Sequence, residues 1–154
     1  MYNLKEATGT YKGLIGECLF KLTRRYAIIT KFFNKKKYFS IFGDRLSEKE
    51  KEFIEKNWFS IDGIEFDYRF SPRKIVLFEV KTMNERYSSK PYWLPKITIA
   101  EKNMYEEAIS LGFSVMVALV NLLDNWNYSV EIKNFEDVKF SIDKPKPYDK
   151  GVSH

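Results

Sequence analysis

Residues 63–82 read GIEFDYRFSPRKIVLFEVKT, and this stretch decides which fold the chain can form. In its first half, apolar side chains at 64, 66, 68 and 70 share one face and charged side chains at 65, 67 and 69 share the other. Such alternation is typical of a β-strand. A Ser-Pro pair at 71–72 favours a turn. Four consecutive apolar residues at 75–78 then indicate a central strand that is buried on both faces.

Glu79 and Lys81 interrupt the apolar pattern near the end of the second strand. They are two residues apart and therefore point to the same face of the strand. A turn centred near residues 71–73 would bring Asp67 close to Glu79. Two carboxylates at close range repel each other unless a cation lies between them, and oxygen ligands favour a hard ion such as Mg²⁺. The alternative is a cross-strand salt bridge at a solvent-facing edge of the sheet.

The spacing of these charges resembles a known catalytic motif. Asp67, eleven intervening residues and then Glu79-Val80-Lys81 on a hydrophobic strand are similar to the motif of the PD-(D/E)XK nuclease superfamily. That superfamily includes restriction enzymes, archaeal Holliday-junction resolvases and RecB-type nucleases. No proline precedes the aspartate here. Asp62 competes with Asp67 for the aspartate position, and we favour Asp67 because it lies within the strand, on its polar face.

The resemblance implies a restriction-endonuclease-like α/β fold, with an αβββαβ core and a mixed central sheet flanked by helices. It also implies an endonuclease that hydrolyses DNA with Mg²⁺ or Mn²⁺. Asp67, Glu79 and the backbone carbonyl of Val80 would hold the metal, and Lys81 would orient or activate the attacking water. Glu17, on the first helix, would assist them.

Two further features follow from the same resemblance. Glu101 and Tyr105 stand four residues apart, similar to the Gln-x-x-x-Tyr pattern of RecB-type nucleases, with glutamate in place of glutamine. A member that resolves four-way junctions would act as a homodimer.

The composition excludes several kinds of chemistry. The chain has 154 residues, one cysteine, and a single histidine at its last position. An internal disulfide, a cysteine-rich zinc site and a histidine general base are therefore nearly excluded. The net charge of +5 suits a polyanionic partner such as nucleic acid, although it also fits a merely soluble basic protein.

We expect one domain over residues 1–143 and a loose tail rich in proline and charge over 144–154. No apolar run approaches the length of a membrane span, and the N-terminus lacks a signal-peptide pattern. An intracellular protein without a membrane partner is the corresponding expectation.

Helical spacing predicts that a first helix buries Ile15, Cys18, Leu19, Leu22, Tyr26 and Ile29, with Glu17 on the opposite, polar face. Capping boxes that begin at Ser47 and Thr98 predict two more helices. Strands are expected at residues 38–42, 113–123, 128–132 and 138–142, and the lysine run at 35–37 is expected to end a helix or form a turn.

Basic and aromatic side chains alternate in the connection that follows the Glu79–Lys81 strand. This mixture suits contacts to phosphates and bases, although it also fits a surface loop anchored by its aromatic residues. The residues expected to contact nucleic acid are Lys21, Arg24, Arg86, Lys90, Tyr92, Trp93 and Lys96. Two other functions stay open: a catalytically silent nucleic-acid binder of the same fold, and an assembly protein in which the hairpin charges form only a salt bridge.

Overall fold

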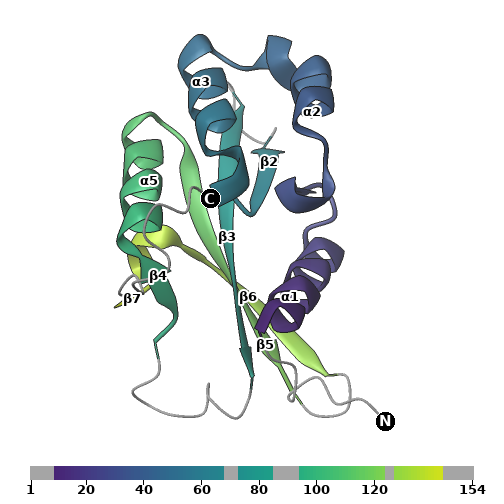
Figure 1. Ribbon diagram of the computed structural model, residues 1–154, viewed down its shortest axis with the longest axis vertical. Helices are drawn as coiled ribbons and strands as arrows, with labels where there is room; N and C mark the ends of the chain where they lie inside the picture. The colour runs from purple at the N-terminus through teal and green to yellow at the C-terminus, as the bar shows by residue number, and fades with distance from the viewer. Residues whose placement is uncertain (1–8, 68–72, 85–93, 124–126, 144–154) are drawn as a thin grey trace.

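The computed structural model describes residues 9–67, 73–84, 94–123 and 127–143. They form a mixed α/β protein, with a five-stranded sheet packed against helices (Figure 1). In chain order the main elements are α1 (Gly9–Thr23), β1 (Ile28–Ile29), α2 (Lys35–Phe42), α3 (Glu48–Asn57), β2 (Gly63–Asp67), β3 (Lys74–Asn84), β4 (Lys96–Thr98), α5 (Ile99–Ser110), β5 (Ser114–Leu122), β6 (Tyr128–Asn134) and β7 (Ser141–Asp143). Short 3-10 turns are η2 (Thr30–Phe32), η3 (Gly43–Arg45), η4 (Trp58–Ser60) and η5 (Phe135–Asp137).

The strands of the main sheet are arranged in the order β1-β2-β3-β5-β6. β2 runs antiparallel to β3, β3 runs parallel to β5, and β5 runs antiparallel to the edge strand β6. The parallel pair requires a crossover, which contains α5. β4 and β7 form a separate two-stranded parallel sheet. The predicted mixed sheet with flanking helices is therefore confirmed at this level.

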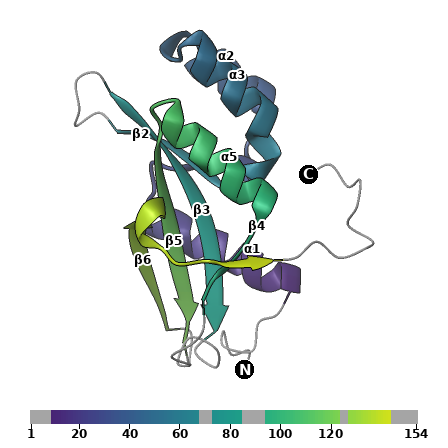
Figure 2. The same cartoon turned by 90° about the vertical axis from the view of Figure 1, so that its left-hand side faces the viewer.

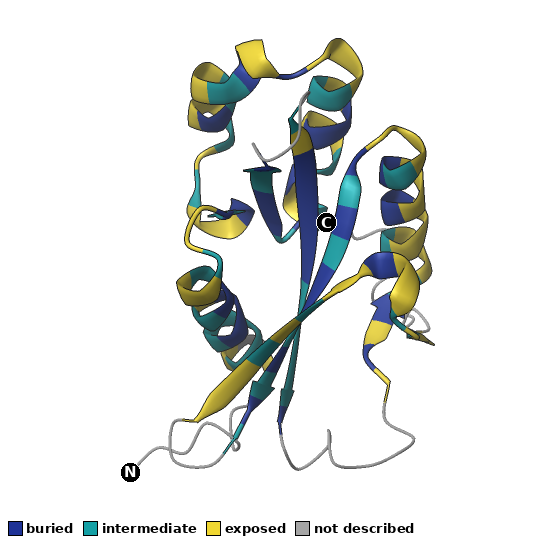
Figure 3. Ribbon diagram, turned by 180° about the vertical axis from the view of Figure 1, so that it is seen from behind, coloured by how far each residue is buried: buried dark blue, intermediate teal, exposed yellow. Residues whose placement is uncertain are grey.

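Both faces of β3 are covered, as its run of apolar residues predicted. Ile75 and Leu77 belong to a core that α2, α3 and α5 cover, whereas Val76 and Phe78 pack with α1. Figure 2 shows α5 and α1 on opposite sides of the sheet, and Figure 3 shows the upper part of β3 as a buried strand. The Glu79 side chain on this strand is therefore enclosed by α5 as well as by the neighbouring strands.

The buried face of α1 agrees only in part with the predicted one. Ile15 and Leu19 pack against the core and Ile29 is buried, as predicted. Cys18 is exposed, and Leu22 and Tyr26 are 71% and 76% exposed, whereas Glu17 and Phe20 are buried. Gly16 explains the difference, because a Cβ atom there would lie 1.8 Å from Oγ1 of Thr82. The Gly16 side of the helix packs closely against β3. This contact, and not the number of apolar side chains, determines which face of α1 is buried.

Residues 35–42 are also a correction, because they form helix α2 and not a turn followed by a strand. The side chain of Asn34 caps this helix by accepting a hydrogen bond from Lys37 N–H at 2.9 Å. The lysine run is thus its first turn. Tyr38 is buried in the helix and packs against Trp58, with ring centroids 5.0 Å apart.

The other elements follow the sequence pattern closely. Both capping boxes are present, at Ser47 with Glu50 and at Thr98 with Glu101. Strands β5 and β6 match the predicted ranges closely, whereas β7 overlaps the predicted strand at 138–142 only in its last two residues and ends at Asp143. No helix in the described ranges is long and apolar enough to cross a membrane. The tail predicted at 144–154 lies outside the described residues.

Candidate active site

The register of the β2–β3 hairpin determines which carboxylates meet. Gly63 pairs with Phe78, and Asp67 pairs with Lys74, so the hairpin is centred between residues 70 and 71. Asp67 opposite Glu79 would require a centre at residue 73. The expectation that these two carboxylates lie together is therefore wrong: Asp67 is level with a residue five positions before Glu79, or about 17 Å along the strand.

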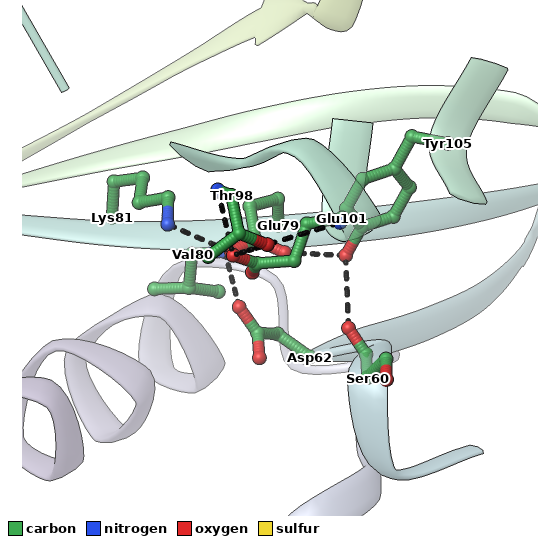
Figure 4. Close-up of polar contacts among 8 residues, drawn as sticks. All are labelled: Ser60, Asp62, Glu79, Val80, Lys81, Thr98, Glu101 and Tyr105. Atoms are coloured by element: carbon green, nitrogen blue, oxygen red, sulfur yellow. Dashed lines mark hydrogen bonds and ion pairs between the residues drawn. The ribbon is translucent and has the colours of Figure 1, made fainter. Parts of the chain in front are cut away.

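Asp62, the competing aspartate, lies beside the charged end of β3. It immediately precedes β2, its side chain points towards Val80 (Figure 4), and its backbone is fixed on both sides. Its N–H donates to the carbonyl of Phe78, and its carbonyl accepts from Thr30 N–H, both at 3.2 Å. Its carboxylate Oδ2 accepts a hydrogen bond from Val80 N–H at 2.8 Å. The backbone thus holds this carboxylate next to the Glu79-Val80-Lys81 segment.

Glu79 and Lys81 form an ion pair on the face of β3 that α5 covers. Lys81 Nζ lies 3.1 Å from Glu79 Oε1, and the Glu79 side chain is only 3% exposed. The second oxygen of this carboxylate accepts a hydrogen bond from the Tyr105 hydroxyl at 2.5 Å. Glu79 is therefore held in place at both oxygens (Figure 4).

Helix α5 supplies two side chains to the same place. Thr98 caps the helix, and both its N–H and its hydroxyl donate to Oε1 of Glu101, at 3.1 and 2.9 Å. Tyr105 lies one turn further along. Figure 4 shows both α5 side chains beside Glu79, so the Glu101-x-x-x-Tyr105 spacing identified in the sequence does converge on the charged strand.

Glu17 reaches the site from α1 and is buried, in contrast to its predicted place on a solvated polar face. Its Oε1 accepts a hydrogen bond from Lys31 Nζ at 2.9 Å. Its Oε2 has no hydrogen-bond partner among the described residues. Glu17 and Asp62 line the same cavity, which places the α1 carboxylate on the Asp62 side of the site.

The carboxylates are costly to ionise where they stand. Burial raises the pKa of Asp62 to about 6, and the nearby negative charge of Glu17 adds to the effect, while the hydrogen bond from Val80 opposes it. Burial, followed by the charge of Asp62, also raises the pKa of Glu79 well above its usual value. Both pKa values are raised first by burial, and the neighbouring negative charges add to that effect.

The pKa values of Lys81, Glu101 and Tyr105 are also shifted by burial and by the neighbouring charges. Burial alone would lower the pKa of Lys81, but the charges of Glu79 and Glu101 outweigh it and raise that pKa above 10.5. Lys81 therefore stays protonated. Burial would likewise raise the pKa of Glu101, but Lys81 and the hydrogen bonds from Thr98 lower it. Burial raises the pKa of Tyr105 well above 10, so its hydroxyl remains a donor to Glu79.

The donor set fits a divalent cation. Two ammonium groups, Lys31 and Lys81, face four carboxylates, namely Glu17, Asp62, Glu79 and Glu101. An ion of charge +2 would balance the ionised groups. In the ranges that the structure describes, no three carboxylate, imidazole or thiol groups form a ready-made metal cluster. Mg²⁺ sites typically use only one or two carboxylates and are completed by water and substrate oxygens, so Asp62 and Glu79 are the candidate ligands for such an ion.

Val80 can add a backbone oxygen to that set. Its N–H points to the side of β3 where Asp62 lies. The N–H and C=O of one strand residue point to the same side, so the Val80 carbonyl faces that side as well. Strand β2 begins at Gly63, opposite Phe78, and does not extend as far as Val80. The carbonyl therefore points past the end of β2, beside the Asp62 carboxylate.

The residues expected to contact nucleic acid fall into three groups. Lys21 and Arg24 are engaged within the fold: Lys21 donates to the carbonyls of Arg25 and Ala27, and Arg24 pairs with Glu65 at 2.7 Å. Lys96 is exposed on β4. Four others lie outside the described residues, namely Arg86, Lys90, Tyr92 and Trp93.

The sequence favoured Asp67, but Asp62 is the aspartate that lies at this site. Asp62 precedes a glycine at the start of a strand, and a hairpin centred near residue 70 places it opposite Glu79. These two features are the sequence signals that indicate Asp62.

Comparison of the chain with protein-family models, with curated proteins and with solved structures finds no match.

Proposed function

We propose that this chain is a metal-dependent nuclease of the PD-(D/E)XK type, in which Asp62 takes the place first assigned to Asp67. The observation that carries the proposal is the position of Asp62 beside Glu79 and Lys81 on a central strand. The element order α1, β1, β2, β3, α5, β5 supports it, because it corresponds to the αβββαβ core that the motif implies. Helices α2 and α3 would then be an insertion between β1 and β2.

The proposed reaction is hydrolysis of a DNA phosphodiester. Asp62, Glu79 and the carbonyl of Val80 would hold a Mg²⁺ or Mn²⁺ ion, which would polarise the phosphate and lower the pKa of water. In the net reaction the oxygen of a water molecule bonds to phosphorus as the bond to the leaving oxygen breaks. The water releases a proton to solvent, and the leaving oxygen takes one up from solvent. Because Lys81 stays protonated, it stabilises negative charge and orients the water by hydrogen bonding, and does not remove a proton from it.

The remaining side chains position these groups. Tyr105 donates to one oxygen of Glu79, which fixes the plane of the carboxylate. Glu101 adds its negative charge beside Lys81 and is itself held by the helix cap at Thr98. Glu17, with its second oxygen unpaired among the described residues, is placed to hold a water molecule on the Asp62 side.

A second hypothesis is a protein of the same fold without metal-dependent nuclease activity. Lys81 already neutralises Glu79 directly, and the described residues hold no cluster of three metal ligands. A catalytically silent nucleic-acid binder or an assembly protein would show these features. Such a protein would neither cut nucleic acid nor respond to divalent ions.

The experiment that separates these functions is a cleavage assay on labelled duplex, single-stranded, flap and four-way-junction DNA and on RNA, with Mg²⁺ or Mn²⁺. We expect metal-dependent cutting by the wild-type protein and at least about a hundredfold loss in Glu79→Gln, because a charged metal ligand and its ion pair are both removed. Equal cutting by both proteins would contradict the assignment. Binding without cutting by the wild-type protein would favour the silent binder.

A further inference from the structure

A cavity of about 690 Å³ adjoins the proposed active site. Glu17 and Asp62 are part of its wall, together with η4, the start of α2 and the segment that joins α1 to α2 along one side of the molecule (Figure 1). Its volume is within the roughly 300–1,000 Å³ of typical ligand sites. The reactions of Asp62 and Glu79 do not require a cavity of this size, so its contents need a separate explanation.

The wall combines an aromatic surface with positive charge. Phe59 is 79% exposed, and Nζ of Lys35 lies 5.8 Å from the centre of its ring. Lys31 and Lys36 also line the cavity. Phe59 contrasts with its neighbour Trp58, which is 2% exposed and belongs to the core. An aromatic face beside lysines is the combination that binds unpaired bases by stacking and phosphates by charge.

The cavity wall also includes the Glu17 carboxylate, one oxygen of which lacks a hydrogen-bond donor among the described residues. Oε2 of Glu17 is buried and has no hydrogen-bond partner among the described residues. A buried carboxylate oxygen without a donor is unfavourable, so a ligand that brings an N–H or O–H group would stabilise this wall. A purely apolar ligand would leave that oxygen unpaired.

We propose that the cavity receives one unpaired nucleotide of the substrate strand, next to the phosphodiester at Glu79. The base would lie against Phe59, and the phosphate near Lys35 and Lys36. This inference rests on the proposed nuclease function and adds a substrate class to it. A nucleotide within a regular duplex is paired and stacked on both sides and cannot enter a pocket unless it leaves the stack. The preferred substrate therefore has a single-stranded end, a flap or a mismatch beside the cleavage point.

The test separates binding from cleavage by using the Glu79→Gln protein without divalent ions. Fluorescence anisotropy would compare a blunt duplex of two separate strands with the same duplex carrying a short single-stranded extension, each as DNA and as RNA. We expect the extension to tighten binding about tenfold, the effect of stacking one base on an aromatic ring. Phe59→Ala should remove this preference and leave the affinity for the blunt duplex nearly unchanged.

Phe32→Ala is the matched control. Phe32, at the end of η2, is also an exposed phenylalanine, but it is not part of the cavity wall. A 2-aminopurine base in the extension gives a direct readout, because its fluorescence changes when it stacks. That change should persist in Phe32→Ala and be lost in Phe59→Ala.

The outcomes distinguish this inference from the proposed function. Equal affinity for blunt and extended duplexes, or equal effects of Phe59→Ala and Phe32→Ala, would overturn the nucleotide pocket even if the wild-type protein cuts DNA. A Phe59-dependent preference in a protein that never cuts would support the pocket and reject the nuclease. Absence of any binding to nucleic acid would reject both.

Discussion

The two ends of β2 carry one aspartate each, and only one of them meets the chemistry of β3. Asp67, at the end of the strand, is level with Lys74, whereas Asp62, just before its start, holds Val80 N–H and lies beside Glu79 and Lys81. Both positions follow from a single quantity, the centre of the hairpin. Strand register, and not the local sequence around an aspartate, therefore determines which carboxylate lies beside Glu79 and Lys81.

Replacing each aspartate by asparagine gives the largest expected difference. Asp62→Asn should lower the rate of metal-dependent cleavage at least about a hundredfold, because it removes a charge that would bind the cation. Asp67→Asn should leave the rate within a few-fold of wild type, since that side chain is far from Glu79 along the strand. Single-turnover cleavage with excess enzyme measures both.

Thermal melting of the two variants provides the control, because Asp67 is itself buried and its replacement can weaken the fold. If the Asp67→Asn protein is folded but inactive and the Asp62→Asn protein is active, Asp67 is the site aspartate and the assignment of Asp62 is wrong.

Asp62→Asn, which should lower activity, should raise the stability of the folded protein. Burial raises the pKa of Asp62 from 3.8 to about 6, so the folded protein retains a proton that the unfolded chain has lost between these values. Its stability therefore falls as the pH rises from about 4 to 6 and stays reduced above that. Asp62→Asn removes this cost while its amide oxygen can still accept from Val80.

We expect the metal-free Asp62→Asn protein to be more stable than wild type at pH 8, by about 3 kcal/mol at most. The gain should largely disappear at pH 4. Urea denaturation in the presence of a chelator, at both pH values, measures the difference. A variant that is less stable than wild type at pH 8 would show that the carboxylate is satisfied in the folded protein without a cation.

A smaller effect is expected where α1 contacts β3, close to the Asp62 end of the hairpin. Gly16→Ala places a methyl group against Thr82 and should cost about 1–3 kcal/mol, as overpacking does. Gly13→Ala meets nothing within 4 Å and should stabilise the helix by up to about 1 kcal/mol. Chemical denaturation of the two variants tests the pair, and equal effects would mean that α1 does not press on the sheet through Gly16.

The sequence predicted those parts of the fold that depend on neighbours along the chain. The capping boxes located α3 and α5 because the paired groups are three residues apart. The apolar runs located β3 and β5, and the four-residue spacing of Glu101 and Tyr105 placed both on the face of one helix turn that meets Glu79.

The errors arose where distant residues decide the outcome. The buried face of α1 depends on how closely Gly16 can approach Thr82, which no count of apolar residues reveals. The choice between Asp62 and Asp67 depended on the hairpin centre, and an error of two and a half residues there displaces the partner by five. Helix α2 is the exception, because its signal is local: Asn34, just before the lysine run, caps the helix by accepting a hydrogen bond from Lys37 N–H.

The edge strand β6 has a consequence for how molecules of this chain associate. In the described sheet it pairs with β5 alone, so its outer backbone groups could serve as a template for a further strand. Glu131 and Lys133 are exposed along it, 3.5 Å apart at their charged ends. Charged side chains on an edge strand disfavour strand addition, because an incoming chain would have to desolvate them. The sheet is thereby protected against edge-to-edge aggregation.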